Sequence, residues 1–458
     1  MHPADFGLGE PRLLDLPREW ATIERRYKPL GPSSPLEWVF EHVRSLGASV
    51  ALLEHQYLDR DYRDEYRQFY AKTFRWIPDR CERLHFWTRR NRYLGYVSLR
   101  PIAGRPVGRT MLAPGPEFED DVSCVAAGSA SPYGIRNTIE AFPYISQDRQ
   151  YGRCAHAVIW MIAQYHHLRF GAPQRFMSEI VSAAASVEFG RVVPSDGLTD
   201  DQVGAALRYL DLGALQYGIG EEDDLTQSDL EKTLRRYLNS AMPVALATPG
   251  HLTAVIGAGY ERGRLEVISC DDEHGVYMRR PIRFPTAEER SGEAEKDSDV
   301  WEMLLAPLPG RIYAPYEEVE KPILEELADL AARFTAPDLL GERRTRVREY
   351  VAEVRDYKAR LRSRGLPQAV ADAHAQVPSA RWLWVVELQD AELAKRSPEC
   401  VLGEIVVDAT SDRDDLVFLY ANLPGTRISW PGPRRNRQVV RVPAAGVQPY
   451  LTGTALNL

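Results

Sequence analysis

Residues 144–160 read YISQDRQYGRCAHAVIW, and the prediction of the fold starts from them. It places Cys154 two residues after Gly152, at the first position of a segment whose apolar residues recur at helical spacing. The amide groups and the positive dipole end of a helix N-terminus stabilise an anion, so Cys154 is predicted to be partly thiolate, the nucleophilic form. The expected apolar face of this helix comprises Ala157, Val158, Met161, Ile162, Tyr165 and Leu168.

A glutamine precedes the cysteine and supplies an amide donor. Gln147 lies seven positions before Cys154, and its side chain could donate to an oxyanion together with the backbone N–H of Cys154. Gln150 is the alternative donor.

A nucleophilic cysteine needs a base, and the stretch AMPVALATPGHLTAVIGAGY, residues 241–260, offers His251 at a distance of 97 positions. The residues after Gly250 alternate as in a strand, which places His251, Thr253 and Val255 on one face. His251 is therefore predicted to face a cleft as the base. The alternative to a catalytic role is a structural histidine at a strand edge, hydrogen-bonded to a backbone carbonyl.

The next predicted strand, 265–270, ends in acidic residues. A hairpin with the His251 strand would bring Asp271 or Asp272 to the imidazole, and Asp271 is the preferred third member. A carboxylate here could instead be an ordinary turn residue. Cys270, Asp271, Asp272 and His274 lack a spaced partner pair, so neither a metal site nor any cofactor is predicted.

The ordered set resembles the bacteriocin-leader (double-glycine) peptidases of the papain superfamily, over residues 140–310 only. The matching positions are Gln147, Gly152-x-Cys154, Met242-Pro243-Val244, Gly250-His251, Gly257-Ala258-Gly259-Tyr260, Asp271 and Gly275. The resemblance implies a bacterial papain-like fold with Cys154 as nucleophile, Gln147 in the oxyanion hole, His251 as base and Asp271 as its orienting acid. The chain departs from the family at Ala155 and His156, where the family has Gly and Pro, and at Asp272, where it has Pro.

The rest of the chain predicts an α+β protein in three parts: an N-terminal α/β region (1–139), the papain-like domain (140–310) and a C-terminal helical and β region (311–458). In the papain-like domain, helices precede an antiparallel sheet. Capping boxes predict the N-termini of two of these helices, Thr199 with Gln202 and Ser228 with Glu231. Long helices are expected over 316–334 and 342–364, and a small sheet after Trp382.

Composition narrows the possible compartment and partners. The net charge of −8 argues against a nucleic-acid partner, and the basic, aromatic stretch 87–96 is interpreted as a strand and turn. No signal peptide or membrane span is evident, so a cytoplasmic protein with no membrane partner is expected. The five scattered cysteines predict no disulfide framework. The sequence does not predict an oligomeric state.

The predicted function is a cysteine peptidase that cleaves a peptide or isopeptide bond of a protein or peptide substrate through a Cys154 thioester. Two alternatives remain: acyl transfer by the same residues, and a papain-like module that binds without chemistry.

Overall fold

The computed structural model describes residues 12–187, 195–219, 225–261, 263–334, 345–363, 379–392, 400–423, 426–430, 438–441 and 450–451. These residues divide into two compact units, unit 1 (Met1–Leu230 and Met242–Pro307) and unit 2 (Glu231–Ala241 and Leu308–Leu458). The predicted domain boundaries stay predictions, and both sides of the one near residue 140 lie within unit 1. The sequence RRNR at 434–437, which is most simply interpreted as a polar loop, lies outside the described residues.

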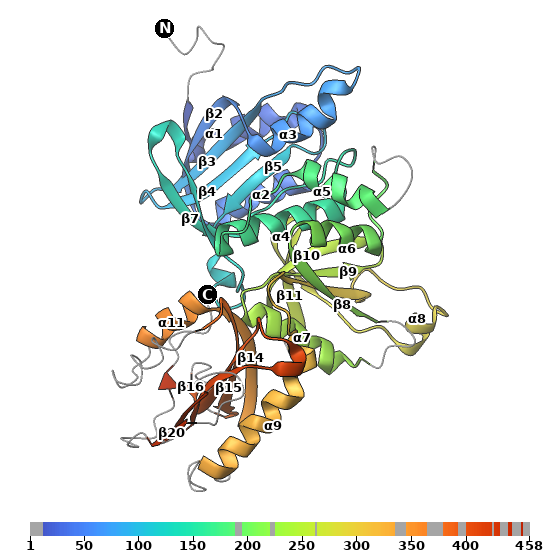
Figure 1. Ribbon diagram of the computed structural model, residues 1–458. Coiled ribbons are helices and arrows are strands. Elements are labelled where there is room, and N and C mark those ends of the chain that lie inside the picture. The colour runs from blue at the N-terminus through green and yellow to red at the C-terminus, as the bar shows by residue number, and fades with distance from the viewer. Residues whose placement is uncertain are drawn as a thin grey trace. The chain divides into compact units, whose positions relative to one another are not determined.

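The first part of unit 1 is a five-stranded antiparallel sheet in the order β1-β2-β3-β4-β5 (Figure 1). Its strands are β1 (Arg12–Asp15), β2 (Ala48–Tyr57), β3 (Cys81–Thr88), β4 (Tyr93–Leu99) and β5 (Val107–Leu112). Three helices accompany it, α1 (Leu16–Tyr27), α2 (Ser34–Ser45) and α3 (Arg60–Gln68), and a hairpin follows, β6 (Ala126–Ala130) with β7 (Asn137–Ala141). Tyr93 and Tyr96 are buried in an apolar cluster, so the aromatic rings of this stretch belong to the core.

The second part of unit 1 begins with helices. They are α4 (Cys154–Phe170), α5 (Met177–Ala184), α6 (Asp200–Tyr209) and α7 (Gln227–Asn239), which continues into unit 2. The predicted capping box of α6 is present, with Gln202 N–H donating to Thr199 Oγ1. The predicted box at Ser228 is wrong by two residues: Thr226 and Asp229 make the reciprocal hydrogen bonds, because an Asp carboxylate reaches back to the backbone N–H of Thr226.

A six-stranded sheet follows, in the order β12-β11-β10-β9-β13-β8. Its strands are β8 (Leu212–Gly218), β9 (Val244–Thr248), β10 (His251–Glu261), β11 (Arg264–Asp271), β12 (Gly275–Pro281) and β13 (Met303–Pro309), with the short helix α8 (Ala287–Ser291) before β13. The pairs of β10 with β9 and β11, of β11 with β12 and of β9 with β13 are antiparallel. Helices before an antiparallel sheet confirm the α+β class.

Helix α4 begins at Cys154, as predicted, but it is not amphipathic. Apart from the half-buried Leu168, its apolar residues are buried on all sides, as are His156, Gln164 and His166. Figure 1 shows α4, α5 and α6 between the two sheets of unit 1. The prediction of one buried face is wrong because the N-terminal sheet region covers the other: Trp160 Nε1 donates to Asp61 of α3 over 3.1 Å.

Unit 2 carries a six-stranded antiparallel sheet, β14-β15-β17-β18-β19-β20. Its elements are α9 (Tyr316–Phe334), β14 (Thr345–Glu353), α11 (Val354–Ser363), β15 (Trp382–Asp390), β16 (Cys400–Val401), β17 (Gly403–Asp408), β18 (Phe418–Leu423), β19 (Thr426–Ser429), β20 (Gln438–Arg441) and β21 (Tyr450–Leu451). Helix α9 and the late sheet agree with prediction. The expected helix over 342–364 is wrong across 345–353, where pairing with β15 along the whole strand overrides helical propensity.

Within the described residues, none of the helices combines the length and the apolar character needed to cross a bilayer.

Candidate active site

Cys154 occupies the first turn of α4 and is partly accessible. The turn is closed by His156, whose Nδ1 accepts the backbone N–H of Arg153 over 3.3 Å. Burial lowers the pKa of His156 to about 4, so its ring is neutral and can accept this hydrogen bond. His156 is therefore a capping residue at the position where the resembled family has Pro.

The loop before the helix is shaped by Asp148. Its Oδ1 accepts the backbone N–H groups of Gln150, Tyr151 and Gly152 over 3.0, 2.9 and 2.7 Å, and its Oδ2 accepts the hydroxyl of Tyr70. An Asp followed within four residues by Gly is a turn signal that sequence reasoning could have used. The carboxylate holds the backbone between Gln147 and Cys154 in one conformation.

The N-terminal sheet holds the start of the same loop. Tyr144 exchanges two backbone hydrogen bonds with Thr110 of β5, and the buried Arg100 donates to the carbonyl of Ser146 over 2.8 Å. Arg100 is itself fixed by a buried ion pair with Glu65 of α3, at 2.9 Å. The N-terminal sheet region, for which no sequence motif predicts a role, therefore supports the backbone directly before Gln147.

His251 enters the site from a tight hairpin. Strands β9 and β10 pair Thr248 with His251, which leaves Pro249 and Gly250 as the two turn residues. Gly250 has φ +70°, a left-handed conformation that glycine adopts without steric cost. The hairpin fixes His251 as the first residue of β10, with its side chain 21% exposed.

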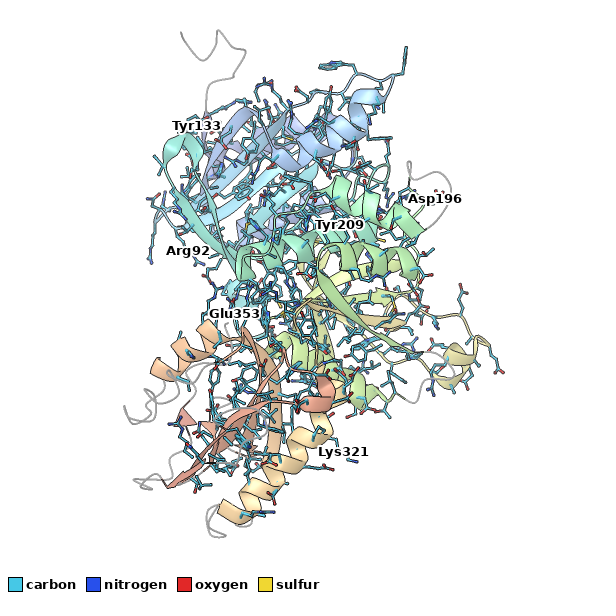
Figure 2. All side chains as sticks on the ribbon, viewed as in Figure 1. Arg92, Tyr133, Asp196, Tyr209, Lys321 and Glu353 are labelled. Carbon is cyan, nitrogen blue, oxygen red and sulfur yellow. The ribbon has the colours of Figure 1, made fainter. Side chains whose placement is uncertain are left out.

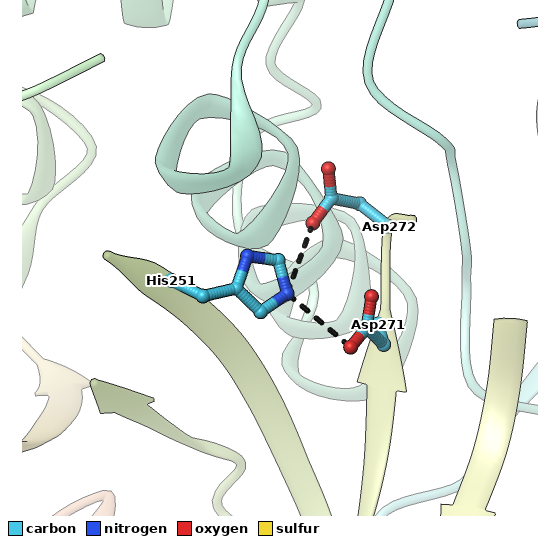
Figure 3. A group of neighbouring side chains, drawn as sticks. All are labelled: His251, Asp271 and Asp272. Carbon is cyan, nitrogen blue, oxygen red and sulfur yellow. Dashed lines mark ion pairs between the residues drawn. The ribbon is translucent and has the colours of Figure 1, made fainter. Parts of the chain in front are cut away.

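The imidazole faces two carboxylates at the end of β11 (Figure 3). His251 Nε2 lies 3.2 Å from Asp271 Oδ2 and 3.9 Å from Asp272 Oδ1. The contact between His251 and Asp271 is an ion pair. Its geometry is not that of a well-directed hydrogen bond, because Nε2 and Oδ2 are not suitably aligned. Because Nε2 faces the acids, Nδ1 is the nitrogen left for Cys154, with which the ring also interacts.

Asp271 is buried but well supplied with donors. Its Oδ1 accepts the backbone N–H groups of Glu273 and His274, and Arg280 lies 2.5 Å from Oδ2. Burial opposes ionisation of Asp271, but the interaction with His251 and the charges of His251 and Arg280 outweigh it and hold the pKa well below its usual range. Burial likewise opposes the charge on His251, yet Asp271 and then Cys154 raise the pKa of the imidazole to about 10.

Asp272 is as buried as Asp271 but lacks its hydrogen-bond donors. It has no exposed surface, and neither carboxylate oxygen has a hydrogen-bond partner. Burial, together with the negative charges of Asp271 and Glu273, raises its pKa to about 7 against the opposing effect of His251. Of the two candidate acids, Asp271 is the one that is closer to the imidazole and solvated by donors.

The two candidate glutamines also separate. Gln147 is 5% exposed and lines the cavity that contains Cys154. Its Nε2 donates to Glu273 Oε1 over 2.8 Å. Gln150 lines a different cavity, beside Arg105 and the start of α2.

The cavity at Cys154 has a volume of about 510 Å³. Cys154 and His251 lie at its wall together with Gln147 and Glu273. An apolar lining comes from both the helices and the sheet: Ala155, Leu198, Val203, Ala247, Leu252, Met303 and Leu305. Asp196, labelled in Figure 2, also lines the cavity and is exposed to solvent. The cavity can hold an apolar side chain beside the sulfur.

His251, Asp271 and Asp272 together could also hold a cation. The ligand atoms of His251, Asp271 and Asp272 lie within 4.8 Å of one another, the one such set in the described part of the chain. Cys270 and His274, considered with them in the sequence, do not belong to the set. Arg280 and His251 already compensate the charge of Asp271, so the arrangement fits a proton-transfer pair better than a metal centre.

The other cysteines whose side chains are described are inert by position. Cys81, Cys124 and Cys270 are buried free thiols, and burial raises the pKa of each well above the ordinary value. Cys154 is the accessible one of the four.

Comparisons with known proteins add little to this geometry. No family model and no curated protein matches the chain. Among solved structures, the crystal structure of UfSP from C. elegans is similar at 15% identity with a TM-score of 0.26, over 36% of this chain. The chain spans about a third of that protein's length, 33%. A score this low does not establish a common fold, so the site is defined by its own residues and distances.

Proposed function

We propose that the chain is a papain-like thiol hydrolase, similar to the bacteriocin-leader peptidases, that cleaves a peptide or isopeptide bond. The proposal rests on one observation: the accessible Cys154, at the start of a helix, and His251 line the same cavity. Nε2 of His251 faces the buried, ionised carboxylate of Asp271. These are the requirements of an activated thiol nucleophile.

The reaction begins from the ion pair in which the Cys154 proton already lies on His251, which Asp271 stabilises as imidazolium. The thiolate attacks the substrate carbonyl, the C–S bond forms, and the carbonyl electron pair moves to oxygen. The backbone N–H of Cys154 and the amide of Gln147 are the proposed donors to this oxyanion. His251 then protonates the leaving amine as the C–N bond breaks.

Water completes the cycle. His251 takes a proton from water, hydroxide adds to the thioester, and the C–S bond breaks to release the carboxylate and restore the thiol. The apolar lining of the cavity favours a substrate with an apolar side chain next to the scissile bond.

The first test is alkylation of Cys154 by iodoacetamide at pH 5 to 9, detected by mass spectrometry. The protein carries Cys400→Ser, so that the four cysteines left are those whose burial is known. Cys154 is expected to be alkylated at mildly acidic pH, where an ordinary thiol is almost unreactive, and to lose that advantage in His251→Ala. Cys124 and Cys270 serve as internal controls because they are buried. A Cys154 that reacts only at alkaline pH would favour the binding module over the hydrolase.

A further inference from the structure

We propose that Glu273 is a positioning residue that fixes the Gln147 amide with its nitrogen toward the reacting carbonyl. The inference rests on the proposed hydrolase function and deepens it. That function assigns no role to Glu273 and does not say what orients the amide of Gln147.

The hydrogen bond between Gln147 and Glu273 can run in only one direction, with the amide as donor and the carboxylate as acceptor. An ionised carboxylate only accepts hydrogen bonds, whereas a glutamine amide has an accepting oxygen and a nitrogen with two N–H groups. Gln147 Nε2 lies 2.8 Å from Glu273 Oε1, so one N–H is directed at the carboxylate. The second N–H of the same nitrogen remains for the cavity that Gln147 and Cys154 both line.

Glu273 is held in place from several sides. Arg149 donates to its Oε1 through Nε over 3.2 Å and through a second guanidinium nitrogen, and Arg105 lies 3.7 Å from the same oxygen. Burial disfavours the charged carboxylate, but the two arginines outweigh it and keep the pKa of Glu273 below its usual value. The acceptor is therefore ionised at neutral pH.

The backbone of Glu273 is tied to the triad acid. Its N–H donates to Asp271 Oδ1 over 2.9 Å. One turn thus connects both halves of the site: Asp271 orients His251 on one side, and Glu273 orients Gln147 on the other.

Without the carboxylate, the Gln147 amide can rotate and present its oxygen to the cavity, where it would repel the oxyanion. Loss of one oxyanion donor slows related reactions by about 10² to 10³. Because Glu273 acts only through orientation, Glu273→Ala is expected to slow acylation by about tenfold to a hundredfold. Glu273→Gln should have a smaller effect, since its amide can still accept through oxygen.

The test uses two reagents on the full chain with the Cys400→Ser change. 4-Nitrophenyl acetate acylates the thiolate through an oxyanion, forming a C–S bond as 4-nitrophenolate leaves. 2,2′-Dipyridyl disulfide reacts with the same thiolate by exchange at sulfur and forms no oxyanion. Glu273→Ala is expected to slow the first reaction and leave the second unchanged. Glu289→Ala removes another Arg–Glu pair of unit 1, away from the cavity, and should alter neither.

A double-mutant cycle separates positioning from general destabilisation. Gln147→Ala should slow acylation at least as much as Glu273→Ala, and the double variant should be no slower than Gln147→Ala alone. Additive losses, equal losses with both reagents, or an unchanged Glu273→Ala would each overturn the inference. A parent protein that is not acylated would overturn the hydrolase proposal itself, and the inference with it.

Discussion

Replacing Asp272 by asparagine removes a negative charge from a side chain that has no exposed surface and no hydrogen-bond donor. Its pKa rises from an ordinary 3.8 to about 7 in the folded chain. A tenfold change in this ionisation equilibrium corresponds to about 1.4 kcal/mol, so ionised Asp272 destabilises the fold by about 4 kcal/mol. An isosteric amide carries no such penalty.

The sign follows from proton binding. Below about pH 4 the carboxyl is protonated in both the folded and the unfolded chain, and the penalty is absent; it grows as the pH rises and is complete above about pH 7. About 3 kcal/mol of it develops between pH 5 and pH 8. In a large domain this corresponds to about 2 °C per kcal/mol, so Asp272→Asn should gain about 6 °C more over the parent at pH 8 than at pH 5.

Differential scanning calorimetry at the two pH values measures this gain in the thermal midpoint. Asp196→Asn is the matched control, since it makes the same chemical change at an exposed carboxylate and should show no pH-dependent gain. If Asp272→Asn and the parent differ equally at pH 5 and pH 8, then Asp272 does not ionise in a buried site and the reasoning is refuted.

Three further predictions follow from contacts in unit 1. His251→Ala should lower the thermal midpoint most between about pH 4 and pH 6.5. The raised pKa of His251 stabilises fully below 6.5 and this stabilisation is lost as the pH rises through about 10, whereas the lowered pKa of Asp271 stabilises above 3.8 and this stabilisation is lost as the pH falls. A constant loss from pH 4 to 10 would contradict this. Gly257→Ala places a Cβ 2.2 Å from the Asp121 carbonyl oxygen and should destabilise by about 2 kcal/mol or more in denaturant titrations. Gly204→Ala on α6, where the added Cβ meets only Arg208 at an ordinary contact distance of 3.8 Å, should be neutral or stabilising. Arg100→Met leaves Glu65 buried without its partner and should destabilise by about 3 to 5 kcal/mol, and Arg283→Met, at the more exposed pair with Glu289, should destabilise much less; similar losses in the two variants would count against the supporting role of Arg100.

Local features of the site follow from the sequence because they depend on neighbouring residues. A helix beginning at Cys154, a strand beginning at His251 and a strand ending near Asp271 are set by apolar period and by the turn at Gly250. The capping box at Thr199 is local in the same sense. Their roles in catalysis remain predictions.

Other features depend on partners far along the chain. The strand 345–353 has a helix-like pattern and becomes a strand because β15 pairs with all of it. The apolar pattern of α4 shows one face, but the helix is buried all round because α3 and the N-terminal sheet cover the other.

The choice between the two acids shows where sequence information ends. Asp271 and Asp272 are adjacent and chemically identical, so the sequence alone could place an acid near His251 but could not separate them. Only the tertiary structure directs two backbone N–H groups and Arg280 to Asp271, while Asp272 lies buried without a donor. Likewise, the pairing of Gln147 with Glu273 depends on a contact across 126 residues, which no local pattern records. Local periodicity and turn residues determine where elements begin and end, whereas solvation of a charge depends on the whole packed environment.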